Sequence, residues 1–171
     1  MIISKGRDPA IILKDMGNLA LYLLMANTEA MKASQSLNFN GFKRKHRYRS
    51  HQYFEIMQAL QCYSFCYSGE NIKLDNPTLV YNPLTLKEHL TFMVKDTADK
   101  LMQIGVLNME FNSSTGFDCN KAECIKKLLL EDMIKFKRWL DKFEKCSWNE
   151  SVMNDIDMHI HEKYKMKEKN D

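Results

Sequence analysis

Apolar residues recur along most of the chain at alternating steps of three and four positions, which is the repeat of one helix face. The clearest run covers residues 9–37. Its apolar positions are Ile12, Met16, Leu19, Leu23, Ala26, Ala30, Ala33 and Leu37. Asp8 and Pro9 precede this run as an N-cap residue and a first-turn proline. The pattern therefore predicts a long helix that packs one face into a bundle.

A second run covers residues 39–67 and ends at Ser68-Gly69, a typical C-terminal stop. Its face consists of Phe39, Phe42, His46, Arg49, Tyr53, Ile56, Leu60, Tyr63 and Tyr67. His46 and Arg49 interrupt an otherwise apolar and aromatic face. The connection to the first helix, around residues 38–41, is short, so we expect the two helices to be antiparallel neighbours.

Residues 70–83 contain Pro77 and Pro83 and predict a long connection without regular structure. At ~3.3 Å per extended residue it can reach about 45 Å, enough to cross from one end of a bundle to the other. Helices are predicted at 84–107 and 120–146, with a turn at 108–118 between them. The third face consists of Leu86, Leu90, Met93, Thr97, Leu101 and Ile104, and the fourth of Ala122, Ile125, Leu129, Asp132, Phe136, Trp139 and Phe143.

A short fifth helix is predicted at 152–164, followed by a charged tail that we expect to fray. The whole chain, 1–171, is then a single all-α domain, a four-helix bundle with its core at about 10–148. The scarcity of turn residues agrees, with six glycines and three prolines in 171 residues.

Charge and cysteine content bear on the partners and the cellular location to expect. The net charge of +3 is modest and does not by itself indicate a nucleic-acid partner. The apolar residues of the first helix are broken by Lys14, Asp15 and Asn18, so we expect neither a secretory signal nor a membrane span. We therefore expect a cytoplasmic protein without a membrane partner, whose five cysteines are reduced.

The helix order resembles the ferritin family over residues 10–164. Asn18-Leu19-Ala20-Leu21-Tyr22 is similar to the family's first-helix stretch N-L-E-L-Y. The segment from Ser68 to Leu74, followed by Pro77, is similar to the start of its long loop, and residues 129–132 to its fourth-helix L-x-E-Q. The resemblance implies a ferritin-like four-helix bundle with a long crossover and a short fifth helix.

Ferritins bind two irons in a ferroxidase centre of carboxylates and a histidine inside the bundle. Carried over residue by residue, the first-helix and third-helix glutamates fall on Ala20 and Val94. The second-helix glutamate falls on Glu55, the histidine on Gln58 and the fourth-helix glutamine on Asp132. Only Glu55, Gln58 and Asp132 are left as a remnant metal site. The alternative is that these residues form a buried polar network without a metal.

The resemblance thus implies a divergent, light-chain-like subunit without ferroxidase activity. It would serve a structural or iron-storage role in a cage or smaller oligomer, alone or with other ferritin-like subunits, and is not expected to be an enzyme. Iron is the one cofactor to expect, bound weakly or not at all.

Two alternatives start from the basic segment 43–51. Its positively charged or ionisable residues are Lys43, Arg44, Lys45, His46, Arg47, Arg49 and His51. As a surface patch it would make the protein a helical adaptor that binds nucleic acid or another protein. The spacing of Arg44 and His51 also allows a helical RNase. If the segment has no binding function, it is a solvated helix face, or its charges are paired with those of another subunit across an interface.

Overall fold

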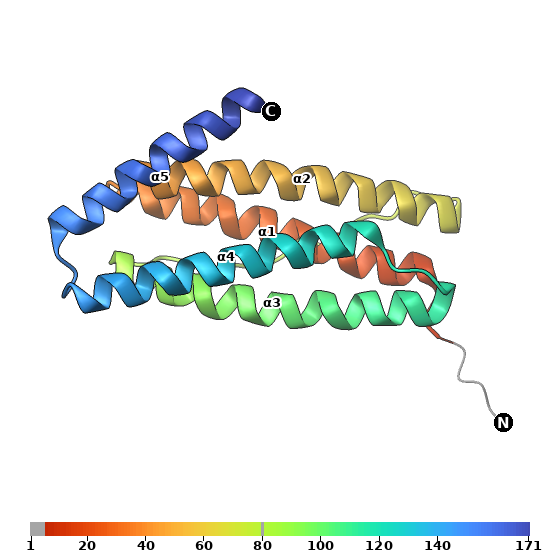
Figure 1. Cartoon of the computed structure of the whole chain (residues 1–171). Coiled ribbons are helices and arrows are strands. Elements are labelled where there is room, and N and C mark those ends of the chain that lie inside the picture. Colours follow the sequence, from red (N-terminus) through yellow and green to blue (C-terminus); the bar gives the residue numbers. More distant parts are fainter. Residues whose placement is uncertain (1–5, 80) are drawn as a thin grey trace.

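The structure is a computed structural model that describes residues 6–79 and 81–171. Within them the chain forms five helices (Figure 1). These are α1 (Pro9–Ser36), α2 (Asn40–Ser68), α3 (Leu86–Thr115), α4 (Asn120–Lys145) and α5 (Glu150–Asn170). The all-α prediction is confirmed.

The helices pack as two antiparallel pairs, α1 with α2 and α3 with α4 (Figure 1). After α2 the chain runs back along the bundle, so that α3 has the same direction as α2. Asn18 of α1 holds this long loop, because its amide donates to the Asp75 carboxylate at 3.0 Å and accepts from the Asp75 backbone N–H at 2.8 Å. The predicted crossover between the second and third helices is confirmed.

The start of α1 and the end of α2 have the cap and stop residues that the sequence indicated. The Asp8 carboxylate accepts from the Ala10 N–H at 2.9 Å, with Pro9 in the first turn of α1. Gly69 ends α2 with a φ of 72°, and Gly116 ends α3 with a φ of 79°. Both conformations are left-handed and favour glycine, which has no Cβ to clash.

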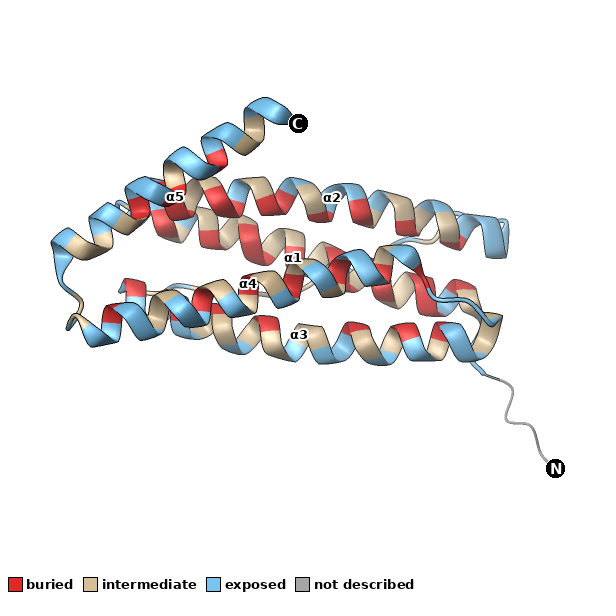
Figure 2. Cartoon of the chain, in the orientation of Figure 1, coloured by how far each residue is buried: buried red, intermediate tan, exposed pale blue. Residues whose placement is uncertain are grey.

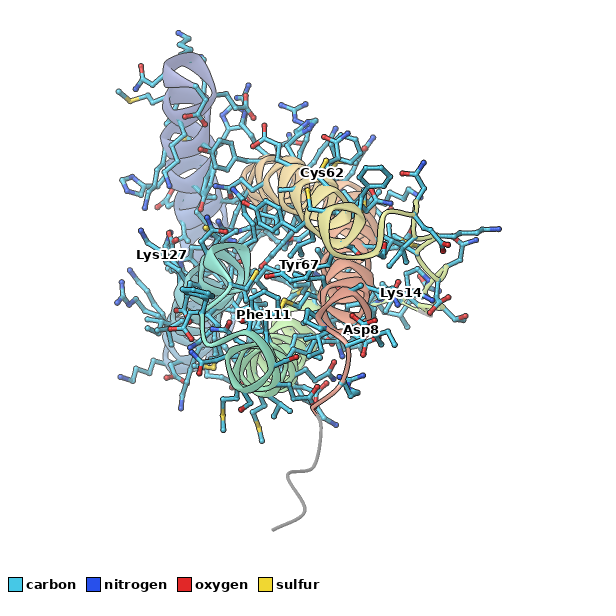
Figure 3. The ribbon with its side chains drawn as sticks, turned by 90° about the vertical axis from the view of Figure 1, so that its right-hand side faces the viewer. Asp8, Lys14, Cys62, Tyr67, Phe111 and Lys127 are labelled. Carbon is cyan, nitrogen blue, oxygen red and sulfur yellow. The ribbon has the colours of Figure 1, made fainter. Side chains whose placement is uncertain are left out.

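The buried residues form stripes that face the bundle interior (Figure 2). On α4 the predicted face is buried from Ala122 to Phe143, with Trp139 half-buried. On α2 the predicted face is buried from Phe42 to Leu60 and includes His46 and Arg49. At one end of the bundle Tyr67 and Phe111 pack edge to face, with ring centroids 6.1 Å apart (Figure 3).

Two predicted boundaries are wrong. Helix α3 continues to Thr115, because Asn108 and Phe111 extend its buried face and the Asn108 side chain accepts from the Cys119 N–H at 2.9 Å. Helix α5 is 21 residues long rather than short. Its charged tail is helical because Glu168 accepts from Arg44 at 3.0 Å on α2.

Helix α1 also departs from the sequence prediction about membranes. Its length and mean hydropathy are sufficient for a membrane span, contrary to the expectation from its charged residues. In the bundle, however, Ile12 and Met16 are fully buried and Leu23 nearly so. The same apolar composition therefore serves a core helix packed between α2 and α3.

Candidate functional site

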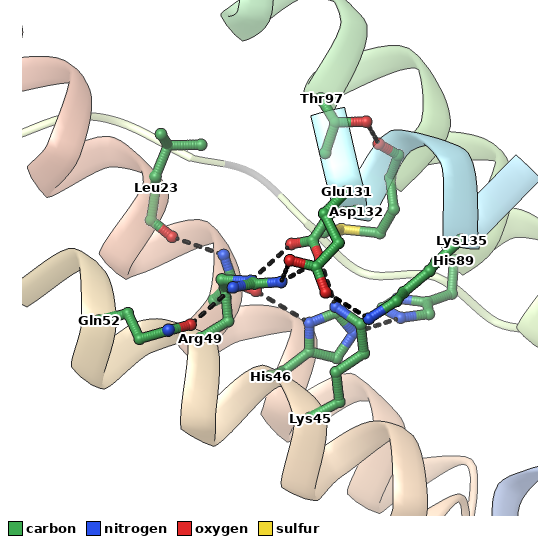
Figure 4. Close-up of polar contacts among 12 residues, drawn as sticks. Leu23, Lys45, His46, Arg49, Gln52, His89, Thr97, Glu131, Asp132 and Lys135 are labelled. Atoms are coloured by element: carbon green, nitrogen blue, oxygen red, sulfur yellow. Dashed lines mark hydrogen bonds and ion pairs between the residues drawn. The ribbon is translucent and has the colours of Figure 1, made fainter. Parts of the chain in front are cut away.

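A cluster of charged and polar side chains lies in the centre of the bundle (Figure 4). We call it the polar centre; it consists of Asn27, Lys45, His46, Arg49, His89 and Asp132. Helix α2 supplies three of them. Residues one and four positions apart share part of a helix face, so Lys45, His46 and Arg49 all point inward from α2.

Asp132 of α4 forms ion pairs with both buried cations. Its Oδ1 accepts from Lys45 Nζ at 2.8 Å and from Arg49 Nη2 at 2.7 Å, and its Oδ2 accepts from Arg49 Nε at 3.0 Å. The three side chains are at most 3% exposed. Arg49 thus makes a two-point contact with the carboxylate, and its Nη1 also donates to Gln52 Oε1 at 2.6 Å.

Burial and the ion pairs act in opposite directions on these groups. Burial alone would raise the pKa of Asp132, but Lys45 and Arg49 outweigh it and hold that pKa below its ordinary value. Burial lowers the pKa of Lys45 to about 8, although Asp132 opposes the shift. At neutral pH the centre therefore holds two positive charges and one negative charge.

A chain of hydrogen bonds continues from this cluster through two histidines. The Asn27 amide donates to the Leu23 carbonyl at 2.9 Å, so its Oδ1 accepts from His46 Nδ1 at 3.0 Å. Burial, followed by the nearby His89 and Lys45, holds the pKa of His46 well below its ordinary value, so the ring is neutral. Its Nε2 then accepts from His89 Nε2 at 3.0 Å.

His89 is neutral as well, because burial and then Lys45 lower its pKa to about 4. Its Nδ1 is left to accept the Tyr81 hydroxyl hydrogen bond. From Tyr81 to Leu23 each group thus donates to the next, and both ring nitrogens of each histidine are used. Aromatic residues also pack against the histidines: the His46 ring stacks on Phe136 with ring centroids 5.7 Å apart.

This arrangement is suited to holding helices together and not to binding a metal cation. Asp132 is occupied by two cations, and the histidine nitrogens that could ligate a metal are hydrogen-bonded to other side chains. In residues 6–79 and 81–171 no group of three or more His, Cys, Asp or Glu side chains is placed to hold a metal ion. The expected interpretation of Asp132 as part of a buried polar network matches this geometry.

The other two residues of the remnant metal site lie elsewhere. Glu55 and Gln58 are exposed on α2, whereas Asp132 faces the interior of the bundle. The structure therefore does not bring Glu55, Gln58 and Asp132 together. The physical reason is helical phase, because Tyr53, Ile56 and Leu60 occupy the buried face of this part of α2.

The basic segment 43–51 is divided between the interior and the surface. Lys45, His46 and Arg49 are buried, and Lys43 is half-buried. On the outer side, Arg44 and Arg47 donate to Glu168 of α5 at 3.0 and 3.2 Å. His51 is exposed. The segment therefore does not present the continuous cationic surface that a nucleic-acid interface on these residues requires, and Arg44 of the RNase alternative is paired with α5.

Sequence reasoning missed three members of the network: Asn27, His89 and Tyr81. A signal for two of them was present, because Asn27 and His89 adjoin Ala26 and Leu90 on the predicted buried faces. A polar residue next to a core position of a helix lies at the edge of the buried face, so its side chain can reach the interior. Tyr81 lies in the long loop, where no periodicity indicates which way a side chain points.

Comparison of the chain with protein family models and with curated protein sequences finds no match. Over the described residues the protein is all-α, with five helices packed as antiparallel pairs and a long loop between α2 and α3.

Proposed function

We propose that the chain is a ferritin-like subunit without ferroxidase activity that acts as a structural partner in an oligomer. The topology supports the ferritin-like part of this proposal. Helices α2 and α3 run in the same direction and are joined by a long crossover, and a fifth helix follows the bundle (Figure 1). This is the helix order that the sequence resemblance implies.

The observation that carries the non-catalytic part is the state of Asp132. The resemblance places a ferroxidase-centre residue at this position, yet the carboxylate is held by Lys45 and Arg49 at 2.7–3.0 Å. An iron cation entering this centre would meet two positive charges in a medium of low dielectric, where like charges repel strongly. Iron is therefore bound weakly or not at all by the polar centre.

Support for assembly comes from the outer face of α3. Met102, Val106 and Met109 recur at helical spacing and are 74%, 56% and 72% exposed. Met102 and Val106 border a surface cavity of about 700 Å³ between α1 and α3, and Met109 borders a neighbouring one of about 270 Å³. Exposed apolar side chains that lie next to one another indicate an interaction surface, whereas apolar side chains scattered singly over a surface do not. We take this stripe as the part of the surface that contacts a neighbouring subunit.

The test combines mass and metal content on one sample. Size-exclusion chromatography with light scattering should give a multiple of the 20.1 kDa chain mass, and metal analysis of the same peak should find much less than one iron per chain. Added ferrous iron should oxidise no faster than in buffer. Stoichiometric iron or catalysed oxidation would overturn the non-catalytic assignment.

A pair of double variants tests the subunit contact. Met102→Gln with Met109→Gln should shift the protein toward the monomer mass, because the variant removes two of the three apolar side chains of the stripe. The matched control, Met158→Gln with Met166→Gln, changes two comparably exposed methionines of α5 and should keep the assembly. A wild-type monomer at all concentrations, or equal behaviour of both variants, would contradict the structural role proposed for α3.

A further inference from the structure

A second site candidate lies between α4 and α5, next to the polar centre, since its lining residue Tyr164 has its ring centroid 6.0 Å from Lys45 Nζ. Helix α5 packs mainly on α2 and diverges from α4, as Figures 1 and 3 show. The cleft between them has a volume of about 380 Å³. Pockets that bind small organic molecules typically have volumes of about 300–1,000 Å³, so this cleft is large enough for one.

The walls of the cleft carry an excess of positive charge. Lys135, Arg138 and Lys142 of α4 and Lys163 of α5 line it, against the single carboxylate of Asp155. Lys135 is paired with Glu131 at 2.5 Å. Across residues 6–79 and 81–171, no carboxylate lies within ion-pair distance of the other three cations.

Lys163 lies close enough to Lys135 and Lys167 to be affected by their charges. The charge of Lys135, followed by burial and the charge of Lys167, lowers the pKa of Lys163. Like charges held close together in a partly enclosed space raise the free energy of the empty cleft. An anion that enters with more than one negative charge would relieve this repulsion, whereas a single carboxylate would balance only one of the cations.

The more enclosed part of the lining is apolar and aromatic. It consists of Trp139 on α4 and of Ile156, Ile160 and Tyr164 on α5. Ile160 and Tyr164 are almost fully buried, and Trp139 is half-buried. A purely inorganic anion would leave the exposed parts of Trp139 and Ile156 uncovered, so the lining favours a ligand with a planar or apolar body attached to its charged group.

The cleft is preformed because α5 is fixed on α2. The Asp157 carboxylate accepts from the Phe42 N–H at 2.9 Å. Gly41 allows the two backbones to approach so closely that a Cβ at this position would lie 1.8 Å from the Asp157 carbonyl oxygen. A ligand entering the cleft therefore does not have to position the helix backbones that form its walls, which reduces the cost of binding.

We propose that the α4–α5 cleft binds a nucleotide-like organic phosphate, with its phosphates held by Arg138, Lys142 and Lys163 and its base against Trp139. Guanidinium and ammonium groups are the standard phosphate-binding side chains, and an aromatic indole is a suitable surface for a planar base. Arg138, Lys142 and Lys163 belong neither to the polar centre nor to the proposed subunit contact of α3, so variants of these three residues test the cleft independently of both.

Tryptophan fluorescence offers a direct test. The chain has two tryptophans, so Trp148→Phe leaves Trp139 as the only indole, and it lies in the cleft. ATP titrated into this variant at low ionic strength should change the Trp139 emission in a saturable way. Adenosine and tripolyphosphate, which carry only one half of the ligand each, should both bind more weakly than ATP.

Charge variants decide whether the cleft is responsible. Arg138→Gln with Lys163→Gln should weaken ATP binding at least about tenfold, as expected for the loss of charge-assisted hydrogen bonds. The matched control, Lys127→Gln with Lys165→Gln, removes the same number of charges from exposed positions of the same two helices outside the cleft. It should stay within about twofold of the parent, as expected when only screened surface charges are lost.

Three results would overturn the proposal. The first is an unchanged emission at millimolar ATP, and the second is equal weakening by both double variants, which would indicate diffuse charge attraction. The third is single-stranded RNA that binds more tightly than ATP and is weakened equally by both pairs, which would indicate an extended nucleic-acid surface. Circular dichroism of each variant establishes that the helices are intact.

Discussion

Asp132 is the residue whose replacement tests the polar centre most directly. Asp132→Asn keeps the size of the side chain but removes the one carboxylate that Lys45 and Arg49 share. The side chain is 2% exposed and accepts three charge-assisted hydrogen bonds, so water cannot replace it without opening the bundle. The variant therefore leaves the buried Lys45 without a counter-charge, and Arg49 with only the half-buried Glu131 at 3.6 Å.

The magnitude follows from measurements on comparable buried ion pairs. Removing one partner of such a pair costs ~3–5 kcal/mol, because the charge left behind is desolvated and unpaired. A domain of this kind is stable by only ~5–15 kcal/mol, so the loss is a large fraction of the total. Since burial already lowers the pKa of Lys45 to about 8, its proton loss should relieve part of the cost at alkaline pH.

The assay is urea unfolding followed by circular dichroism, at neutral pH and again near pH ~9. Asp141→Asn is the matched control, because Asp141 is an exposed residue of the same helix. Its effect should be within ~0.5 kcal/mol of wild type. Replacing the whole ion cluster, with Lys45→Met, Arg49→Met and Asp132→Leu together, should recover most of the stability that Asp132→Asn loses.

The reasoning would be refuted by a loss below ~1 kcal/mol for Asp132→Asn, because that value belongs to an ordinary neutral hydrogen bond. It would also be refuted if the loss were the same at pH ~9 as at neutral pH, since Lys45 would then not be the residue that carries the unpaired charge.

Further predictions concern pH and the docking of α5. Burial lowers the pKa of both His46 and His89, that of His89 to about 4. The stability that these neutral histidines allow is complete above the pKa of histidine in the unfolded chain, and it is lost as the pH falls toward the lower pKa of the folded state. For His89 this amounts to ~2 kcal/mol between about pH 7 and pH 5, measurable by urea unfolding, and the part due to this residue should vanish in His89→Gln. Gly41→Ala should cost more than ~2 kcal/mol, or release α5 to fast hydrogen exchange, because its Cβ meets the Asp157 carbonyl oxygen. Gly105→Ala is the control, since its Cβ meets no atom within 4 Å, and it should be neutral or stabilising by ~0.5–1 kcal/mol in thermal unfolding; the opposite order would contradict the close-approach argument.

The faces of the helices could be read from the sequence, and their ends only in part. The three-four repeat identified His46, Arg49 and Asp132 as positions on buried faces, and all three are buried. The repeat missed the end of α3 because Asn108 is polar, and it missed the length of α5 because a charged tail has no apolar period. In both cases a contact from another element decides the outcome, Cys119 for Asn108 and Arg44 for Glu168.

The candidate metal residues show a related limit. Glu55 and Gln58 were placed by motif spacing, which takes no account of helical phase. The phase itself was legible, since Tyr53 and Ile56 define the buried face and Glu55 lies outside it. Periodicity was thus a better guide to the interior than the resemblance, because burial of apolar surface fixes the rotation of a helix and a motif does not.

The sequence by itself determined the helices, their antiparallel pairing and the crossover, because these follow from periodicity, turn residues and connection length. Only the tertiary structure decided that Asp132 is held by two cations from α2, that two histidines lie between Tyr81 and Asn27, and that α5 leaves a cationic cleft beside α4. The physical reason is that a one-dimensional pattern records which face is buried. Ion pairs form between charged residues on helices distant in sequence, so they depend on how the helices are packed.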